Sequence, residues 1–438
     1  MRRFGILLGA VLAAPALAAE LPGPVVDDDY MATPQTEVAL GQLLFYDPIL
    51  SGNRNIACAS CHHPRFGTSD GLSLGLGEGG IGLGPERVLD PANTPEERIA
   101  RNAPALWNLG ATEFTVMFHD GRIEADPSRP GGLRTPMDED MTRGFSGVLS
   151  AQSMFPVLSP DEMAGHYGEN EVSKLVRSGK ITGDGGAWDA ISKRVAGIAE
   201  YRAMFDAAYP EIAQGRAIAF TDISNAIAAF IAFEWRSDDS AFDAYLRGEA
   251  ALSAEAQAGL ELFYGEAGCA DCHAGAFQTD HGFHAMAVPQ IGPGKKARFE
   301  DDFRDLGRAR VTGHDEDRYR FRTPSLRNVA LTAPYGHDGA FRDLAAFVAS
   351  HAAGTGPEGY DRAQAVLPEL PGETDWIVLD DPAQSGEIAA AYEGPGRALD
   401  AGEVAALVAF LDALTGETAA EGRLGVPEAV PSGLPVDK

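Results

Sequence analysis

Two stretches decide the fold of this chain: Cys58-Ala-Ser-Cys61-His62 in its N-terminal half and Cys269-Ala-Asp-Cys272-His273 in its C-terminal half. Both read Cys-x-x-Cys-His, the pattern that attaches a c-type haem. Two thiols about one helical turn apart can add to the two vinyl groups of one haem. The adjacent histidine can then supply an imidazole nitrogen to the iron. The sequence therefore predicts two covalently bound haems.

Other chemistry can also use closely spaced cysteines. A redox dithiol needs no histidine after its second cysteine, and a zinc knuckle places its histidines apart from the cysteine pairs. The chain has 4 Cys and 10 His in 438 residues. A histidine after both pairs by chance is therefore expected about once in two thousand such chains. Covalent haem is the interpretation that uses every cysteine.

The composition is that of a globular protein, with 45% hydrophobic and 23% charged residues. Its length suggests two or three domains. Lys and Arg total 35 against 64 Asp and Glu, which gives a formal net charge of −29. A field of this sign repels phosphate backbones, so we expect no nucleic-acid partner. Basic or neutral partner proteins fit the charge, which can equally serve solubility alone.

The first residues have the pattern of an export signal. Arg2 and Arg3 precede an apolar run, and Ala16-Leu17-Ala18 forms a small-residue cleavage site. An anchor helix is the alternative, but the run is short and Pro15 interrupts it. We expect residues 1–19 to be a signal peptide, and the mature chain to be periplasmic and without a membrane span.

A second repeated pattern precedes each motif. Gly41–Phe45 and Gly259–Phe263 both read Gly-x-x-Leu-Phe, which indicates a diverged duplication. We expect a mainly α fold with two cytochrome c-like haem domains joined by long loops rich in glycine and proline. The expected bounds are 20–240 for the N-terminal domain, 241–418 for the C-terminal domain and 419–438 for a disordered tail.

Two further patterns have clear local interpretations. Asp400-Ala-Gly-Glu403 is a capping-box start for an apolar helix. The stretch Gly75-Leu-Gly77-Glu-Gly-Gly80 matches Gly-x-Gly-x-x-Gly. It follows a haem motif rather than a strand, and no helical pattern opens on it, so nucleotide binding is not predicted. We interpret it as a flexible loop.

With the two motifs, four other stretches give the chain its resemblance to a known family. The chain resembles the bacterial di-haem cytochrome c peroxidases and their MauG-like relatives from about Pro34 to Gly416. The stretches are Arg101-Asn-Ala-Pro104, His119-Asp-Gly-Arg122, Arg322-Thr-Pro-Ser-Leu-Arg-Asn328 and Thr332-Ala-Pro-Tyr-Gly-His-Asp-Gly339.

The resemblance implies a division of labour between the haems. The N-terminal haem would react with hydrogen peroxide, and a six-coordinate C-terminal haem would carry electrons. A calcium ion between the domains would be bound by Asn102, Thr332 and Pro334, through oxygen atoms that calcium accepts readily. Asn102 and Thr332 as simple loop caps are the alternative.

The resemblance also points to His351 as the second axial ligand of the C-terminal haem, counted from Thr332. Leu344, Phe347 and Val348 share one helical face with His351, so a satisfied core histidine is the alternative. In the peroxidase branch a loop histidine closes the first haem, but here that position is Thr94. We therefore expect a five-coordinate first haem that is open to peroxide.

An open haem needs a group that moves a proton between the two oxygens of peroxide. The family pattern of Gln, Pro and Glu is matched by Gln152, Pro156 and Glu162. Glu162 is the expected acid–base, although Ser-Pro-Asp-Glu can also simply start a helix. Where the family often has a tryptophan between the haems, this chain has His119. His119 is either a relay or a loop residue, and Trp107 is another candidate relay.

Three functions remain open at this point. The first is an exported di-haem peroxidase that receives electrons from a small cytochrome or copper protein. The second is a MauG-like enzyme that uses peroxide to oxidise side chains of a partner protein. The third is a non-enzymatic electron carrier with both haems closed.

Overall fold

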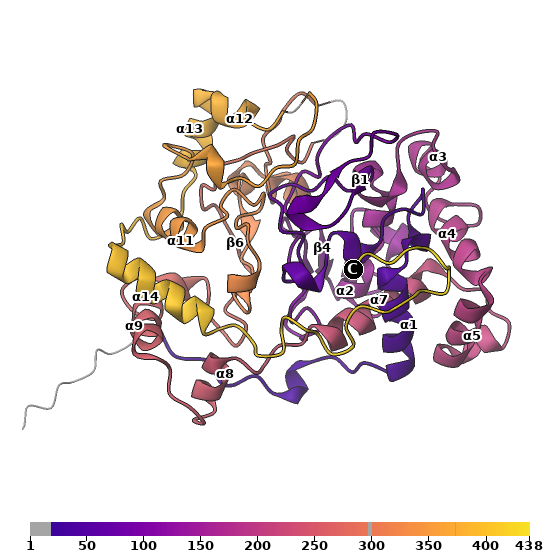
Figure 1. The fold of residues 1–438 in the computed structure, drawn as a ribbon, viewed down its shortest axis with the longest axis horizontal. Coiled ribbons are helices and arrows are strands. Elements are labelled where there is room, and N and C mark those ends of the chain that lie inside the picture. Colours follow the sequence, from indigo (N-terminus) through magenta and orange to yellow (C-terminus); the bar gives the residue numbers. More distant parts are fainter. Residues whose placement is uncertain (1–18, 297–299, 373) are drawn as a thin grey trace, which may run out of the picture.

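The computed structural model describes residues 19–296, 300–372 and 374–438 (Figure 1). Apart from residue 19, the expected signal peptide lies outside this part of the chain. Within the described residues, no helix is both long and apolar enough to cross a membrane. The fold is rich in helices and poor in strands, as a mainly α protein should be.

The helices of the N-terminal half are drawn in indigo to pink in Figure 1. They are α1 (Gln35–Tyr46), α2 (Val148–Gln152), α3 (Glu171–Arg177), α4 (Ala187–Ala196), α5 (Ala199–Ala208), α6 (Pro210–Ala213) and α7 (Phe220–Glu234).

The C-terminal half follows in pink to yellow. Its helices are α8 (Ala241–Leu246), α9 (Ala254–Phe263), α10 (Ala309–Thr312), α11 (Leu344–Ala353), α12 (Ile377–Asp380), α13 (Pro382–Ala390) and α14 (Ala401–Asp412). The predicted capping box starts α14: the Asp400 carboxylate accepts hydrogen bonds from the backbone of Gly402 and Glu403, and the Asp400 N–H donates to Glu403.

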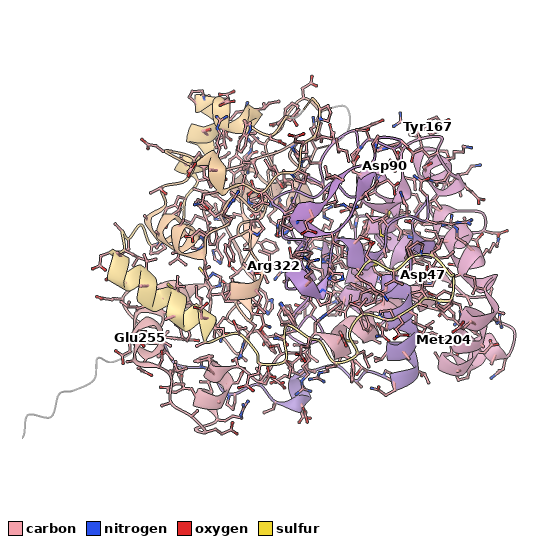
Figure 2. All side chains as sticks on the ribbon, viewed as in Figure 1. Asp47, Asp90, Tyr167, Met204, Glu255 and Arg322 are labelled. Carbon is pink, nitrogen blue, oxygen red and sulfur yellow. The ribbon has the colours of Figure 1, made fainter. Side chains whose placement is uncertain are left out.

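All strands of the described chain are short and antiparallel. The pair β1–β2, the three-stranded sheet β3–β4–β5 and the pair β6–β7 are built from Gly80–Ile81, Val88–Leu89, Val116–Met117, Ile123–Ala125, Leu133–Arg134, Phe283–His284 and Phe321–Arg322. The turn between β3 and β4 carries His119, and β7 ends at Arg322. Figure 2 labels Arg322 where the two halves meet.

Each half is built on one pair of crossing helices. In the first, α1 packs on α7, and in the second, α9 packs on α14. A side chain on Gly41 would begin 1.8 Å from the Ala226 carbonyl oxygen, and one on Gly259 would begin 1.9 Å from the Ala406 carbonyl oxygen. The repeated Gly-x-x-Leu-Phe pattern therefore marks the point where two helix backbones touch.

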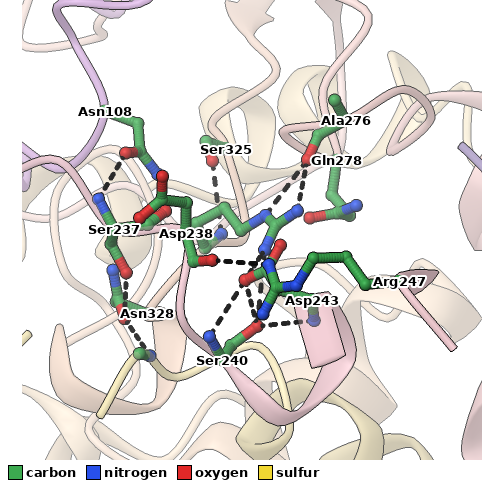
Figure 3. Close-up of polar contacts among 12 residues, drawn as sticks. Asn108, Ser237, Asp238, Ser240, Asp243, Arg247, Ala276, Gln278, Ser325 and Asn328 are labelled. Carbon is green, nitrogen blue, oxygen red and sulfur yellow. Dashed lines mark hydrogen bonds and ion pairs between the residues drawn. The ribbon is translucent and has the colours of Figure 1, made fainter. Parts of the chain in front are cut away.

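The likeness of the two halves extends to a pair of buried asparagines that the sequence analysis did not predict. Asn108 donates its N–H to the Trp235 carbonyl after α7, and Asn328 donates to the Leu414 carbonyl after α14. Both asparagines have positive φ, 58° and 61°. Both also bond to Ser237, in the segment that joins the halves (Figure 3). Equivalent residues of the two halves thus meet at one polar junction.

Two large groups of buried apolar side chains correspond to the halves. The first extends along the chain to Trp235 and also includes Phe277 and Val430, while the second begins at Phe242. The ends of the chain cross between them: the Ala19 N–H donates to the Tyr264 carbonyl, and the last residues lie against the N-terminal half.

The expectation of a disordered tail over 419–438 is wrong. Val430 is 5% exposed, the Ser432 hydroxyl donates to Asp47, and Glu234 accepts hydrogen bonds from the backbone of Leu424 and Gly425. In Figure 2, Asp47 lies beside this yellow segment. The apolar residues of this tail show no periodicity in the sequence, because each packs separately on the surface of the N-terminal half.

The glycine-rich stretch 75–80 is not a flexible surface loop either. Leu72, Leu74 and Leu76 are at most 1% exposed, and Glu78 is completely buried. Alternating leucines are the signal that could have predicted this burial.

The glycine crossing gives a testable prediction for stability. Gly259→Ala places a methyl group against the Ala406 carbonyl, so α9 and α14 must move apart. We expect the free energy of unfolding to fall by about 1–3 kcal/mol, measured by urea denaturation followed by circular dichroism. Gly386→Ala, in α13, meets no atom within 4 Å and is the matched control, expected to be neutral or stabilising by up to about 1 kcal/mol. Equal effects of the two substitutions would contradict the packing argument.

Candidate functional site

In the first motif, the Nδ1 atom of His62 is hydrogen-bonded, which leaves its Nε2 atom to bind a metal. Cys58–Ser60 form a 3₁₀ turn, and the His62 N–H donates to the Cys58 carbonyl at 3.0 Å. The His62 Nδ1 lies 3.0 Å from the Thr68 carbonyl oxygen. A carbonyl can only accept, so Nδ1 carries the proton and Nε2 keeps its lone pair. This is the arrangement that orients a metal-binding imidazole.

The second motif repeats this arrangement. Cys269–Asp271 form a 3₁₀ turn, and the His273 Nδ1 lies 3.2 Å from the Gln278 carbonyl oxygen. Thr68 and Gln278 both have positive φ, 62° and 50°, so each accepting carbonyl sits in a left-handed turn. The two turns are equivalent positions of the duplication.

Burial keeps the groups of both motifs uncharged. It lowers the pKa of His62 and of His273, which favours the neutral imidazole that binds a metal. It also raises the pKa of the Cys58 and Cys61 thiols to about 12. A neutral imidazole is the form in which either histidine could bind an iron ion.

A largely apolar cavity of about 320 Å³ opens beside the second motif. Cys269, Cys272, His273 and His351 all line it. The group formed by Cys272, Asp280 and His284, whose ligand atoms lie within 4.8 Å of one another, shares a thiol with the haem motif and belongs to this site.

His351 faces His273 from α11. The two ring centroids are 6.4 Å apart. Metal–imidazole bonds are about 2 Å long, so one iron between two coordinating rings would put their centroids roughly 6 Å apart. Burial, and secondly His273, lowers the pKa of His351 to about 3, so this ring is also neutral. The residues fit an iron bound by two histidines.

The predicted distal residues come from three short turns of one segment. Gln152 ends α2, Pro156 starts the 3₁₀ turn Pro156–Leu158, and Glu162 lies in the π-helical turn Pro160–Ala164. The charge of Glu162 acts on both Cys61 and His62, which places this carboxylate near the first motif.

Thr94, the position at which the resemblance would place a closing histidine, is exposed. Its hydroxyl donates to the Asp90 carbonyl at 3.3 Å, so it stays within its own turn.

Lys295 is a neighbour of the distal segment that sequence reasoning missed. Burial lowers its pKa, and Glu162 is the first of the charges that act on it. It lies in an irregular loop far along the chain, and no sequence pattern connects it to Glu162.

The residues expected to bind calcium all line the same cavity between the halves: Asn102, Thr332 and Pro334. The Asn102 amide donates to the Leu72 carbonyl at 2.7 Å, and the Thr332 hydroxyl donates to the Val329 carbonyl at 3.0 Å. The structure therefore brings the three residues together, with two of their side chains engaged as donors.

Both candidate relay residues also line this cavity. The His119 Nε2 lies 3.2 Å from the Asn102 carbonyl oxygen, and burial followed by Arg101 lowers the pKa of His119 to about 4. Trp107 is 4% exposed, and its indole nitrogen has no hydrogen-bond partner within the described residues.

A buried ion-pair cluster lies next to His119 and connects the halves. Arg101 contacts Asp305 at 2.6 Å and Asp120 at 2.8 Å. Burial alone would raise the pKa of the Asp305 and Asp120 carboxyls, but the Arg101 guanidinium holds both pKa values below the usual range for aspartate. The pKa of Asp305 falls to about 2. Sequence reasoning quoted Arg101 but missed Asp305, because its partner is distant in the chain and no pattern links them.

A family model described as di-haem cytochrome c peroxidase matches residues 35–251. The methylamine utilization protein MauG of Methylorubrum extorquens is 30% identical over 72% of this chain and 67% of its own. Cytochrome c peroxidase Ccp of Escherichia coli is 31% identical over 70% of this chain and 51% of its own, so the chain matches about half of that protein.

Solved structures of two proteins have a fold similar to that of this chain. A MauG-like protein associated with microbial copper homeostasis has a TM-score of 0.57 and 26% identity, with 94% of this chain and 97% of its own covered. The di-haem peroxidase BthA of Burkholderia thailandensis has a TM-score of 0.54 and 22% identity, with 97% of this chain and 98% of its own covered.

The Arg101 cluster gives a prediction for stability and its pH dependence. Arg101→Gln leaves Asp305 buried without a cation, so we expect the free energy of unfolding at pH 7 to fall by about 3–5 kcal/mol. In the wild type, the depressed pKa of Asp305 stabilises the fold above about pH 4, and this contribution disappears as the pH falls toward 2. The slope of stability between these values should be smaller in the variant, as followed by urea denaturation.

The control for this substitution is Arg129→Gln, which removes an exposed ion pair with Asp126 and should change stability by less than about 1 kcal/mol. A similar small effect of Arg101→Gln would contradict a role of the cluster in joining the halves.

Proposed function

The chain belongs to the di-haem cytochrome c peroxidase family, and on that premise we propose that it is an exported enzyme that reduces hydrogen peroxide at an open N-terminal haem. Members of this family carry c-type haems, and the relatives named above are oxidoreductases. The observation that carries the proposal is the position of the turn that holds Glu162: the Met163 carbonyl accepts a hydrogen bond from the Gly52 N–H at 2.7 Å, in the segment that leads to Cys58.

Haem attached at Cys58 and Cys61 would supply the iron that accepts peroxide. His62, oriented by the Thr68 carbonyl, would hold this haem. Thr94, which stands where a closing histidine would be, is exposed and bonded within its own turn. Glu162 would take a proton from one peroxide oxygen and return it to the other. Gln152 and Pro156 would shape the pocket around it.

The C-terminal half would supply electrons. His273 and His351 would hold its iron from both sides, and a second imidazole in place of methionine favours a lower reduction potential. Electrons would come from a small cytochrome or copper protein. The domain division at about residue 240 is part of this proposal, as are the periplasmic location and the calcium at Asn102, Thr332 and Pro334, between the halves. His119 and Trp107 both line the cavity beside the second motif and are the candidate relays.

A second function has one observation in its favour. The solved MauG-like protein named above shares 26% identity with this chain over nearly its whole length, and an open first haem suits MauG-type chemistry. In that case the oxidising equivalents of peroxide would be directed to side chains of a partner protein. Mixing the enzyme and peroxide with a reduced cytochrome, or with a candidate partner protein, separates the two functions by which substrate becomes oxidised.

The axial ligands can be tested by electron paramagnetic resonance of the purified diferric protein. We expect one high-spin and one low-spin haem in equal amounts, and we expect His351→Ala to convert the low-spin signal to high-spin. Two low-spin haems in the wild type would mean that the first iron is closed. The protein would then be an enzyme gated by reduction or a simple electron carrier.

The role of Glu162 has a separate kinetic test. Glu162→Gln keeps the shape but removes the base, so the rate of reaction with peroxide should fall by about 10²–10⁴-fold. The electron paramagnetic resonance spectrum should stay that of the wild type. Glu200→Gln, at an exposed position of α5, is the matched control. An unchanged peroxide rate in Glu162→Gln would exclude this carboxylate as the acid–base.

A further inference from the structure

A group of amide and carboxylate side chains surrounds Glu78, in the glycine-rich stretch that the haem sites do not use. Asparagine side chains from two loops converge on the Glu78 Oε1 atom: the amide nitrogens of Asn53, Asn55 and Asn93 lie 2.9, 2.7 and 2.9 Å from it. Glu78 is 0% exposed, and its Oε2 atom has no hydrogen-bond partner among the described residues. We propose that these residues form a calcium site.

The carboxylates at this site are not balanced by a Lys or Arg within the described residues, which favours the binding of a cation. The Asn53 amide nitrogen also lies 2.6 Å from the Glu169 Oε2 atom, so two carboxylates face one amide group. No Lys or Arg of the described chain forms an ion pair with Glu78. Arg87, on the same stretch, donates to the carbonyls of Gly77 and Gly82 instead. A buried carboxylate without a cationic partner is unfavourable, and a divalent ion would remove that imbalance.

The oxygen atoms needed for coordination are within reach. The Asn53 orientation is held, because its Oδ1 accepts a hydrogen bond from Asn170 at 2.9 Å. Asn53 therefore remains a donor that positions the two carboxylates. The side chains of Asn55 and Asn93 bond only to Glu78 within the described residues, so rotation of each amide can turn its Oδ1 toward a cation. The candidate ligands are both oxygens of Glu78, the Oδ1 atoms of Asn55 and Asn93, and Glu169.

This ligand set favours calcium over other metals. Calcium takes six to eight oxygen ligands in flexible geometry, at about 2.3–2.6 Å, so opposite ligands lie about 5 Å apart. Zinc and copper prefer thiolate or imidazole ligands, and magnesium demands near-ideal octahedral geometry. Asn55 is exposed, which gives an ion and its remaining waters a path to the site. The net charge of −29 also attracts cations to the protein.

The site would join three segments around the first haem motif. Asn53 and Asn55 directly precede Cys58 in the chain. The Glu78 N–H donates to the Asp161 carbonyl at 2.9 Å, beside Glu162. The Gly52 N–H donates to the Met163 carbonyl at 2.7 Å, on the other side of Glu162. A bound calcium ion would therefore fix the distal turn relative to the loop that carries the cysteines.

Calcium binding can be measured on the holoprotein after treatment with a chelator. Calcium chloride is titrated by isothermal calorimetry, and bound calcium per chain is counted by mass spectrometry. We expect Glu78→Gln to bind one calcium ion fewer per chain than the wild type. Asn55→Ala and Asn93→Ala should each raise the dissociation constant of this calcium ion by about tenfold or more. The control is Glu86→Gln, on the same loop with a side chain 80% exposed, which should bind calcium as the wild type does.

The result is the difference in bound calcium per chain between the wild type and Glu78→Gln. This difference does not depend on any other calcium ion, including one at Asn102. Equal calcium in the wild type and Glu78→Gln would overturn the proposal, as would a wild type that binds none. If Glu78→Gln loses its haem absorbance or its helical circular dichroism, Asn93→Ala decides in its place. An unchanged dissociation constant for every calcium ion in Asn93→Ala would then overturn the proposal.

Discussion

The structure depends on the close approach of two helix backbones in each half, at a glycine that leaves no room for a side chain. Gly41 touches the backbone of α7 at Ala226, and Gly259 touches the backbone of α14 at Ala406. Each crossing lies in the helix that precedes a haem motif: α1 comes before Cys58, and α9 comes before Cys269. The left-handed turns at Thr68 and Gln278 then offer a carbonyl to the motif histidine. In both halves a left-handed turn thus orients the candidate iron ligand.

The region between the halves is polar where the cores are apolar. Asn108 and Asn328 meet at Ser237 (Figure 3), and Arg101 joins Asp120 to Asp305. Buried charges of this kind are unfavourable unless they are paired, so they define one relative position of the halves. The cavity that contains His273, His351, Asn102 and Trp107 lies at this junction. The candidate relays His119 and Trp107 also line this cavity, so the candidate electron path lies beside the junction.

Local patterns of the chain were enough for some of these features. The attachment motifs, the repeated Gly-x-x-Leu-Phe pattern and the capping box at Asp400 each span only a few consecutive residues. Such short patterns can be recognised directly in the sequence. The helical face of Leu344 to His351 also predicted a ring that points inward, and the structure places it opposite His273. The tail and the glycine-rich stretch were misjudged, because their apolar residues become buried only against surfaces made by distant segments.

The sequence by itself determined that the chain carries two haem-attachment motifs, that a Gly-x-x-Leu-Phe pattern precedes each of them, and which family the chain belongs to. These depend on residue types at fixed short spacing. Only the tertiary structure decided that Asp305 pairs with Arg101, that Lys295 lies near Glu162, that residues 419–438 pack on the N-terminal half, and that asparagines from two loops surround Glu78. The partners in each case are separated by loops of irregular length, and loop geometry follows from packing rather than from periodicity.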